Sequence, residues 1–153
     1  MAGGLGTRFW PISRKALPKQ FLDFTSMGKS FLRKAYDRMS RLIPAENILV
    51  VTLKEFVPLV KAQIPELPEQ NILQEVYNRN TAPCIAYSAR EILKRDPQAV
   101  MIATPADHII DDGQEFEHTM QIALDYATRN RRLLTIGVVP TRPDSNFGYI
   151  QVE

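Results

Sequence analysis

The chain has 153 residues, of which 44% are hydrophobic and 24% charged, a composition typical of one folded domain with a buried core. Its formal net charge of +2 argues against a nucleic-acid partner. The sequence contains no apolar run near the roughly 20 residues of a membrane span and no signal-peptide core, and its single cysteine excludes an internal disulfide. We therefore predict a cytoplasmic protein that binds neither a membrane nor nucleic acid.

The first segment is rich in glycine. Glycines free the backbone for positive φ and let N–H groups approach an anion closely, while nearby basic side chains can balance the anion's charge. A glycine-rich phosphate loop normally follows a buried strand, whereas only Met1 and Ala2 precede this one, so we expect the domain to lack its first strand. The predicted phosphate-binding residues are Ala2, Gly3, Gly4, Gly6, Thr7, Arg8 and Lys19.

Two familiar glycine motifs do not account for this segment. The dinucleotide fingerprint would need glycine where Phe9 stands, and the P-loop pattern ending in Gly28-Lys29-Ser30 would need glycine where Asp23 stands. We interpret Gly28 as a turn residue and Ser30 as the cap of a helix that begins at Phe31.

Predicted helices and strands alternate along the rest of the chain. Apolar residues recur at helical spacing in 31–43, 82–93 and 116–127. Continuous apolar runs at 47–52, 71–75, 99–104 and 133–138 predict buried parallel strands, and 147–152 predicts a further strand that the end of the chain cuts short. The pattern predicts an α/β fold: one Rossmann-like domain over residues 1–153, its mostly parallel sheet flanked by helices and incomplete at both ends.

In such a sheet ligands bind at the carboxyl ends of the strands, and the loop at 78–83 follows one strand. Asn80 or Thr81 is expected to cap the next helix. Glu75 could in addition accept hydrogen bonds from the ring N–H and the amino group of guanine. Adenine does not offer this pair of donors. We predict nucleotide contacts from Glu75, Arg79, Asn80 and Thr81.

The loop at 104–108 follows another predicted strand. Mg²⁺ prefers one or two carboxylates together with substrate phosphates, so Asp107 is the best metal candidate, although it could also be a turn aspartate. His108 has no assigned role, and Cys84 is expected to be a small core residue. A third loop, 137–150, carries Gly148 and Tyr149, where close backbone approach would suit a sugar.

These motifs together resemble one family. The segments 2–11, 18–21, 79–83, 105–108, 137–138 and 146–150 are similar, in order and spacing, to the bacterial mannose-1-phosphate guanylyltransferases, a branch of the sugar nucleotidyltransferases. The glycine loop with Lys19 matches the broader superfamily, and the segments 79–83 and 105–108 narrow the resemblance to the branch that uses GTP.

The resemblance implies an enzyme that transfers GMP from GTP to mannose 1-phosphate with Mg²⁺ as cofactor, releasing pyrophosphate. It implies that Arg8 holds the leaving group, Lys19 stabilises charge at the reacting phosphate, Asp107 binds Mg²⁺, and Gly148 and Tyr149 face the mannose. It leaves a homo-oligomer of the full-length protein open.

Three expectations qualify this interpretation. The family places further segments after residue 153, so we expect this piece alone to be poorly stable and nearly inactive. A sister activity could use glucose 1-phosphate with UTP or dTTP. A nucleotide-sugar-binding module without catalysis is the other alternative, against which Arg8, Lys19 and Asp107 argue.

Overall fold

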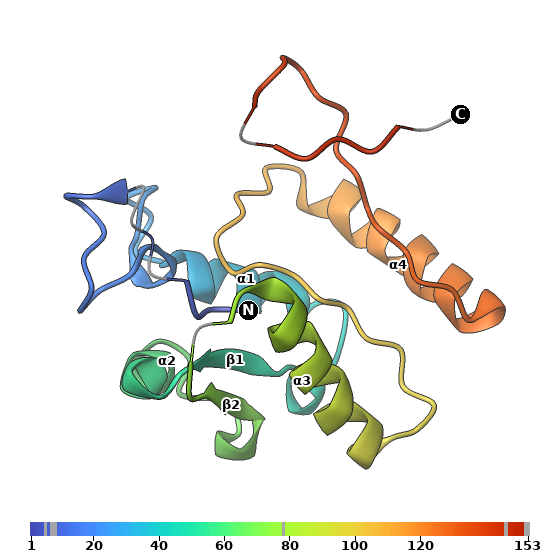
Figure 1. Ribbon diagram of the computed structural model, residues 1–153, viewed down its shortest axis with the longest axis horizontal. Coiled ribbons are helices and arrows are strands. Elements are labelled where there is room, and N and C mark those ends of the chain that lie inside the picture. Colours follow the sequence, from blue (N-terminus) through green and yellow to red (C-terminus); the bar gives the residue numbers. More distant parts are fainter. Residues whose placement is uncertain (5, 7–8, 78, 146, 152–153) are drawn as a thin grey trace.

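The computed structural model describes residues 1–4, 6, 9–77, 79–145 and 147–151. Helices and strands alternate along the first two thirds of the chain, and a long helix precedes an irregular C-terminal segment (Figure 1). The elements are α1 (Phe31–Met39), β1 (Val50–Leu53), α2 (Val57–Gln63), β2 (Ile72–Glu75), α3 (Thr81–Arg95) and α4 (Gly113–Asn130).

The strands β1 and β2 pair in parallel, with Val50 opposite Ile72 and Leu53 opposite Glu75. Parallel neighbours need a crossover connection, and α2 supplies it. The first two residues of each strand pack in two different apolar clusters. Val50 and Ile72 pack in the larger cluster with residues of α1 and α2, whereas Val51 and Leu73 pack with Cys84 of α3. Helices therefore cover both faces of the sheet, which confirms the predicted α/β, Rossmann-like class.

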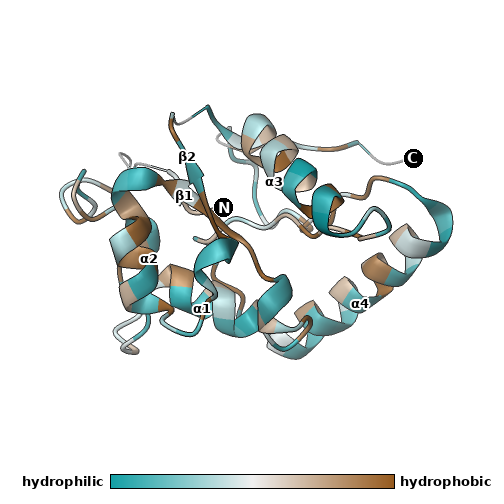
Figure 2. Ribbon diagram, turned by 90° about the horizontal axis from the view of Figure 1, so that it is seen from below, coloured by the Kyte–Doolittle hydropathy of each residue, from teal (hydrophilic) through white to brown (hydrophobic). Residues whose placement is uncertain are grey.

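The prediction for the start of α1 is confirmed. Ser30 is the N-cap, and its side chain accepts a hydrogen bond from the Arg33 backbone N–H, while Gly28 takes a positive φ of 73° in the preceding turn. Cys84 is buried, as expected of a core residue. Helix α4 is amphipathic in Figure 2, and its Phe116 packs against the larger cluster beneath the Arg38 guanidinium, 5.1 Å from the ring centroid.

Several predicted strands are wrong. Residues 99–104 and 133–138 form no strand, and the described part of the last predicted strand, 147–151, is also irregular. Within the described chain no backbone hydrogen bond joins Met101, Ile102 or Ala103 to a partner, so an apolar, extended run lacks the ladder that defines a strand. The segment after α4 is largely exposed, with Leu133 fully so, and it extends away from the strands in Figure 1.

Among the described residues no helix is both long and apolar enough to cross a membrane.

Candidate phosphate-binding site

The first two residues of the chain lie between β1 and the segment at 104–106. The Ala2 N–H donates to the Val51 carbonyl at 2.8 Å, and the Met1 ammonium donates to the Thr104 carbonyl at 3.0 Å. The Ala106 N–H in turn donates to the Met1 carbonyl at 3.1 Å. The glycine segment thus leaves the sheet beside the carboxyl end of β1, which is where ligands bind in parallel α/β sheets.

Gly6 occupies a position that only glycine fits. Its φ is +63°, and a Cβ built there would lie 2.6 Å from the Ser13 hydroxyl oxygen and 3.1 Å from the Lys19 Cβ. A Cβ on Gly4, in contrast, would meet no atom within 4 Å, so that glycine faces open space. The segment therefore combines a constrained turn with an open approach for a ligand. The predicted contacts Thr7 and Arg8 lie outside the described residues.

Lys19 and Asp107 meet at this site. The Lys19 ammonium forms an ion pair with an Asp107 carboxylate oxygen and lies 5.3 Å from the Phe9 ring centroid. Their side chains are 26% and 22% exposed, so both remain open to solvent on one side. Phe9 contacts Phe24 edge-on with their ring centroids 5.2 Å apart, and Phe24 in turn lies 5.2 Å from the ring of Phe31 in α1. His108, next to Asp107, is exposed.

Glu75 ends β2 close to the glycine segment. A Cβ on Gly3 would lie 3.3 Å from a Glu75 carboxylate oxygen, so the two residues are neighbours. Burial raises the pKa of the Glu75 carboxyl above its ordinary value, and the Met1 ammonium partly offsets this. Burial lowers the pKa of that ammonium and, with Glu75 nearby, raises the pKa of the Cys84 thiol. Because burial disfavours the charged form of this carboxyl, hydrogen-bond donors such as those of a purine base would stabilise the carboxylate.

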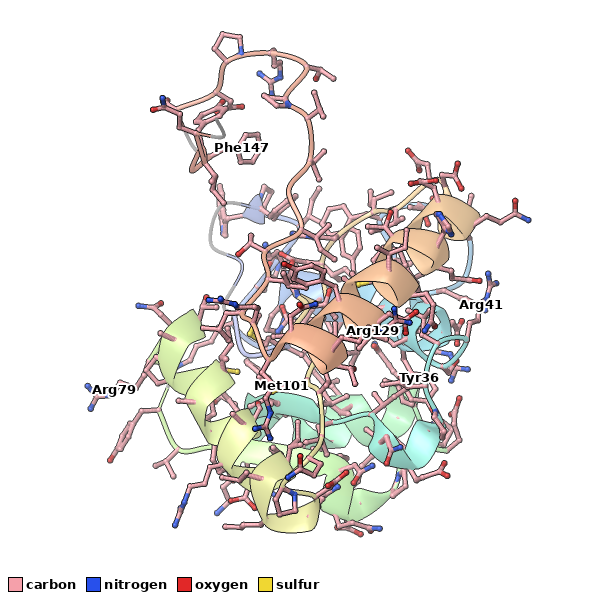
Figure 3. The ribbon with its side chains drawn as sticks, turned by 90° about the vertical axis from the view of Figure 1, so that its right-hand side faces the viewer. Tyr36, Arg41, Arg79, Met101, Arg129 and Phe147 are labelled. Carbon is pink, nitrogen blue, oxygen red and sulfur yellow. The ribbon has the colours of Figure 1, made fainter. Side chains whose placement is uncertain are left out.

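The loop after β2 differs in one detail from expectation. Asn80 holds the N-cap position of α3, with a positive φ of 68°, but its side chain makes no capping hydrogen bond. The prediction that Asn80 or Thr81 caps the helix by a side-chain hydrogen bond is therefore wrong. The Asn80 backbone, with φ 68° and ψ −166°, departs from the extended conformation that an N-cap residue usually takes. Arg79, Asn80 and Thr81 are all exposed, and Arg79 points outward and stacks on Tyr77 at 5.6 Å (Figure 3).

The predicted sugar contacts lie elsewhere in this structure. Gly148 and Tyr149 are exposed, and the Tyr149 hydroxyl bonds to the Asp144 backbone within the same loop. The ion pair between Arg142 and Asp144 also stays within that loop. Figure 3 places Phe147 there, far across the molecule from Arg79.

The structure thus brings together one part of the predicted site and leaves another apart. The residues that it gathers at the end of the sheet are Ala2, Gly3, Gly4, Gly6, Lys19, Glu75 and Asp107. The loop that carries Gly148 and Tyr149 is not among them.

Three residues at the site were not predicted. Gln20, Thr52 and Ser13 are buried, and the first two donate hydrogen bonds to carbonyls of the glycine segment. A threonine in an apolar strand is a signal that could have singled out Thr52, since a buried hydroxyl needs a partner.

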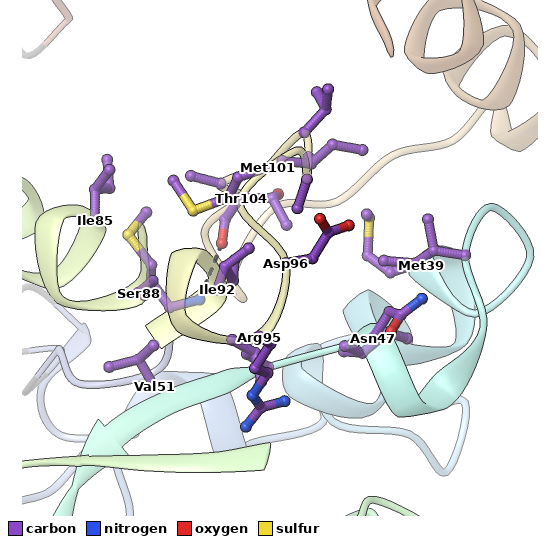
Figure 4. Close-up of a pocket in the computed structure, with 18 of the residues that line it drawn as sticks. Met39, Asn47, Val51, Ile85, Ser88, Ile92, Arg95, Asp96, Met101 and Thr104 are labelled. Atoms are coloured by element: carbon purple, nitrogen blue, oxygen red, sulfur yellow. Dashed lines mark hydrogen bonds between the residues drawn. The ribbon is translucent and has the colours of Figure 1, made fainter. Parts of the chain in front are cut away.

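A separate cavity of about 380 Å³ lies between β1, α3 and the irregular run at 99–104. Figure 4 shows its lining, in which apolar side chains such as Met39, Val51 and Ile92 predominate. Met1 and Thr104 reach it from the side of the glycine segment, whereas Lys19 and Asp107 do not line it. The cavity is therefore separate from the candidate phosphate site.

The parallel strands, the helices on both faces and the glycine loop beside Lys19 and Asp107 define an α/β domain of the class that binds phosphorylated ligands at the carboxyl end of a sheet. The profile of the Nucleotidyl transferase family matches residues 1–153, and the chain belongs to that family.

Relatives with assigned names support this placement. The chain is 39% identical to a mannose-1-phosphate guanylyltransferase of Salmonella montevideo over an alignment of 153 positions, which covers 99% of this chain and 31% of that protein. It is 38% identical to the enzyme of the same name from Escherichia coli, covering 99% of this chain and 32% of that protein. It is 34% identical to the alginate biosynthesis protein AlgA of Pseudomonas aeruginosa, covering 100% of this chain and 32% of that protein.

A solved structure is also similar. A crystal structure described as mannose-1-phosphate geranyltransferase from Thermus thermophilus superposes with a TM-score of 0.71 at 30% identity, over 83% of this chain and 36% of that one. The chain spans about a third of the length of the named relatives.

Proposed function

We propose that this chain is the nucleotide-binding part of an enzyme that transfers GMP from GTP to mannose 1-phosphate, forming GDP-mannose and pyrophosphate. The observation that carries the proposal is the placement of the glycine segment, Lys19 and Asp107 at one end of the sheet. The relatives that bear the name mannose-1-phosphate guanylyltransferase supply the choice of substrates. The cytoplasm is the compartment we propose for it, in keeping with the single cysteine.

The reaction needs no protein nucleophile. A phosphate oxygen of mannose 1-phosphate attacks the α-phosphorus of GTP, the new P–O bond forms, and the bond to the β-phosphate oxygen breaks in line. The electron pair of the broken bond leaves with pyrophosphate. Catalysis of this kind depends on position and on neutralised charge.

The residues of the site fit these needs. Backbone N–H groups of Gly3, Gly4 and Gly6 contact the phosphates, with Ala2 and Thr7 beside them, and Arg8 holds the departing pyrophosphate. Lys19 lies at the reacting phosphate, where its charge counts most because the site excludes part of the water. Glu75, supported by Arg79, Asn80 and Thr81, accepts from guanine. Gly148 and Tyr149 contact the mannose, which requires their loop to lie nearer the glycine segment than it does in this structure.

Mg²⁺ fits the donor set that Asp107 provides. No group of three or more His, Cys, Asp or Glu side chains that could hold a metal occurs within the described residues. A cation held by one carboxylate and by substrate phosphates matches this arrangement and the preference of Mg²⁺. Asp107 would hold the cation, which would supply Lewis-acid polarisation of the phosphates.

A pyrophosphate-release assay on the full-length protein tests the proposal. Turnover is expected with GTP and mannose 1-phosphate in the presence of Mg²⁺. Faster turnover with glucose 1-phosphate and UTP or dTTP would assign the sister activity instead. GDP-mannose binding without any release of pyrophosphate would indicate a binding module.

A further inference from the structure

Two buried polar side chains hold the start of the glycine segment. The Ala2 carbonyl accepts one hydrogen bond from the Thr52 hydroxyl at 3.0 Å and another from the Gln20 side-chain amide at 2.8 Å. The same amide nitrogen donates to the Gly4 carbonyl at 3.0 Å. Gln20 is 3% exposed and Thr52 0% exposed, so these bonds are shielded from water.

The chemistry of the Gln20 amide matches this task. A primary amide has two N–H donors on one nitrogen. Here the amide nitrogen donates to two backbone carbonyls, those of Ala2 and Gly4, which lie two residues apart in the chain. A glutamate of the same shape could only accept hydrogen bonds at neutral pH and would repel both carbonyls. Thr52 adds a donor from the neighbouring strand β1, so the Ala2 carbonyl is held from two elements.

These bonds fix which way the peptide groups of the segment face. In a trans peptide the C=O and the following N–H point in opposite directions, so turning the Ala2 carbonyl toward Gln20 directs the Gly3 N–H the other way. A flexible glycine segment could otherwise rotate its carbonyl oxygens, which carry partial negative charge, toward a phosphate. We propose that Gln20 and Thr52 are positioning residues that hold the Ala2 and Gly4 carbonyls inward, so that these oxygens do not face a polyphosphate bound at the segment.

This inference rests on the proposed function, because it needs a phosphate ligand in the loop. Its test measures binding of GTP and of inorganic tripolyphosphate to the full chain and to Gln20→Met, Thr52→Val and Thr52→Ser. Loss of a buried donor is expected to weaken both ligands roughly tenfold in Gln20→Met and Thr52→Val. Thr52→Ser, which keeps the hydroxyl, is expected to bind within about twofold of the unchanged protein.

Gln63→Met is the matched control. Gln63 also donates from its side-chain amide to a backbone carbonyl, that of Phe21 at 2.9 Å, but outside the glycine segment. It is expected to lower the melting temperature as Gln20→Met does while leaving both affinities unchanged. A role of Gln20 in folding alone would move the melting temperature and not the affinities.

The outcomes separate the two proposals. Unchanged affinities in Gln20→Met and Thr52→Val would overturn the positioning role while leaving the proposed function in place. Tripolyphosphate binding that these variants weaken, without any binding of GTP, would support the positioning role and contradict the proposed nucleotide. A protein that binds neither ligand would overturn both. If Gln20→Met does not fold, the Thr52→Val and Thr52→Ser pair decides alone.

Discussion

Lys19 and Asp107 form an ion pair across the candidate site. This pair joins the chain that follows the glycine segment to the loop at 104–108. In the proposed reaction each has a separate partner, since the ammonium faces a phosphate and the carboxylate a cation. Both partners compete with the ion pair, so substrate binding must part these side chains. The pair therefore keeps two charged groups in place and neutral overall before the ligands arrive.

Lys19→Met is expected to lower kcat by about 100-fold or more, because it removes positive charge from the reacting phosphate. Asp107→Asn is expected instead to raise the Mg²⁺ concentration that gives half-maximal rate, because a neutral amide binds Mg²⁺ more weakly than a carboxylate. Steady-state rates over a Mg²⁺ titration separate the two effects. Lys29→Met serves as the control, since Lys29 pairs with Asp37 away from the site and should change neither quantity. Wild-type kcat in Lys19→Met would contradict the assigned role.

Gly6→Ala and Gly4→Ala are expected to fail in different ways. An alanine at position 6 would take a left-handed backbone and press its Cβ against Ser13, costing about 2 kcal/mol or more of unfolding free energy. Gly4→Ala meets no protein atom within 4 Å and should fold normally, yet the added methyl would block a phosphate. Denaturation and GTP binding distinguish the two, and Gly137→Ala, also in open space, is the control. If Gly4→Ala binds GTP as tightly as the wild type, no phosphate of GTP lies next to Gly4.

Local chemistry made some features predictable from the sequence. The Ser30 cap depends on residues three apart, and the burial of Cys84 follows from helical spacing. The run at 99–104 has the composition of a strand, but a strand also needs a neighbour, and the composition of the run does not report one. The roles of Gln20 and Thr52 depend on contacts with Ala2 from 18 and 50 positions away, a pairing that no local pattern encodes.

The raised pKa of Glu75 should be visible in how the stability of the protein changes with pH. Burial raises its pKa above the ordinary 4.5, so the folded state holds the proton more tightly than the unfolded chain. The stabilisation from this proton is present in full below the ordinary pKa and is lost as the pH rises through the raised value. Glu75→Gln, which stays neutral, is therefore expected to be more stable than the wild type at pH 7 and to lose less stability between pH 4 and 7.

Urea denaturation across that range measures the effect, and Glu69→Gln provides the opposite case. The hydrogen bond from Lys61 lowers the pKa of Glu69, so its contribution is present above the ordinary pKa and falls away in acid. If Glu75 also reads guanine, Glu75→Gln loses preference for GTP over ATP while keeping tripolyphosphate affinity. A Glu75→Gln protein with the wild-type pH slope would show that the carboxyl is not desolvated.

The hydrogen bonds around Met1 and Ala2 resemble those of a strand, and the cavity lies in line with Met1. Met1 and Ala2 bond to Thr104, Ala106 and Val51 on two sides, as a central strand does. Beyond Met1 the cavity of about 380 Å³ continues between β1 and Ile102, with apolar walls. A strand placed in this cavity would lie between β1 and the run at 99–104.

An apolar segment joined to Met1 should fill that space. About five residues rich in Val and Ile, placed before Met1, are expected to pair with β1 on one side and with residues 101–103 on the other. Burial of two such side chains should raise the unfolding free energy by about 3 kcal/mol. A Gly-Ser segment of equal length is the control, because it extends the chain without adding apolar area. Urea denaturation and amide exchange at Met101, Ile102 and Ala103 measure the result. Equal stability and equal exchange in the two extended proteins would show that the cavity does not accept a strand.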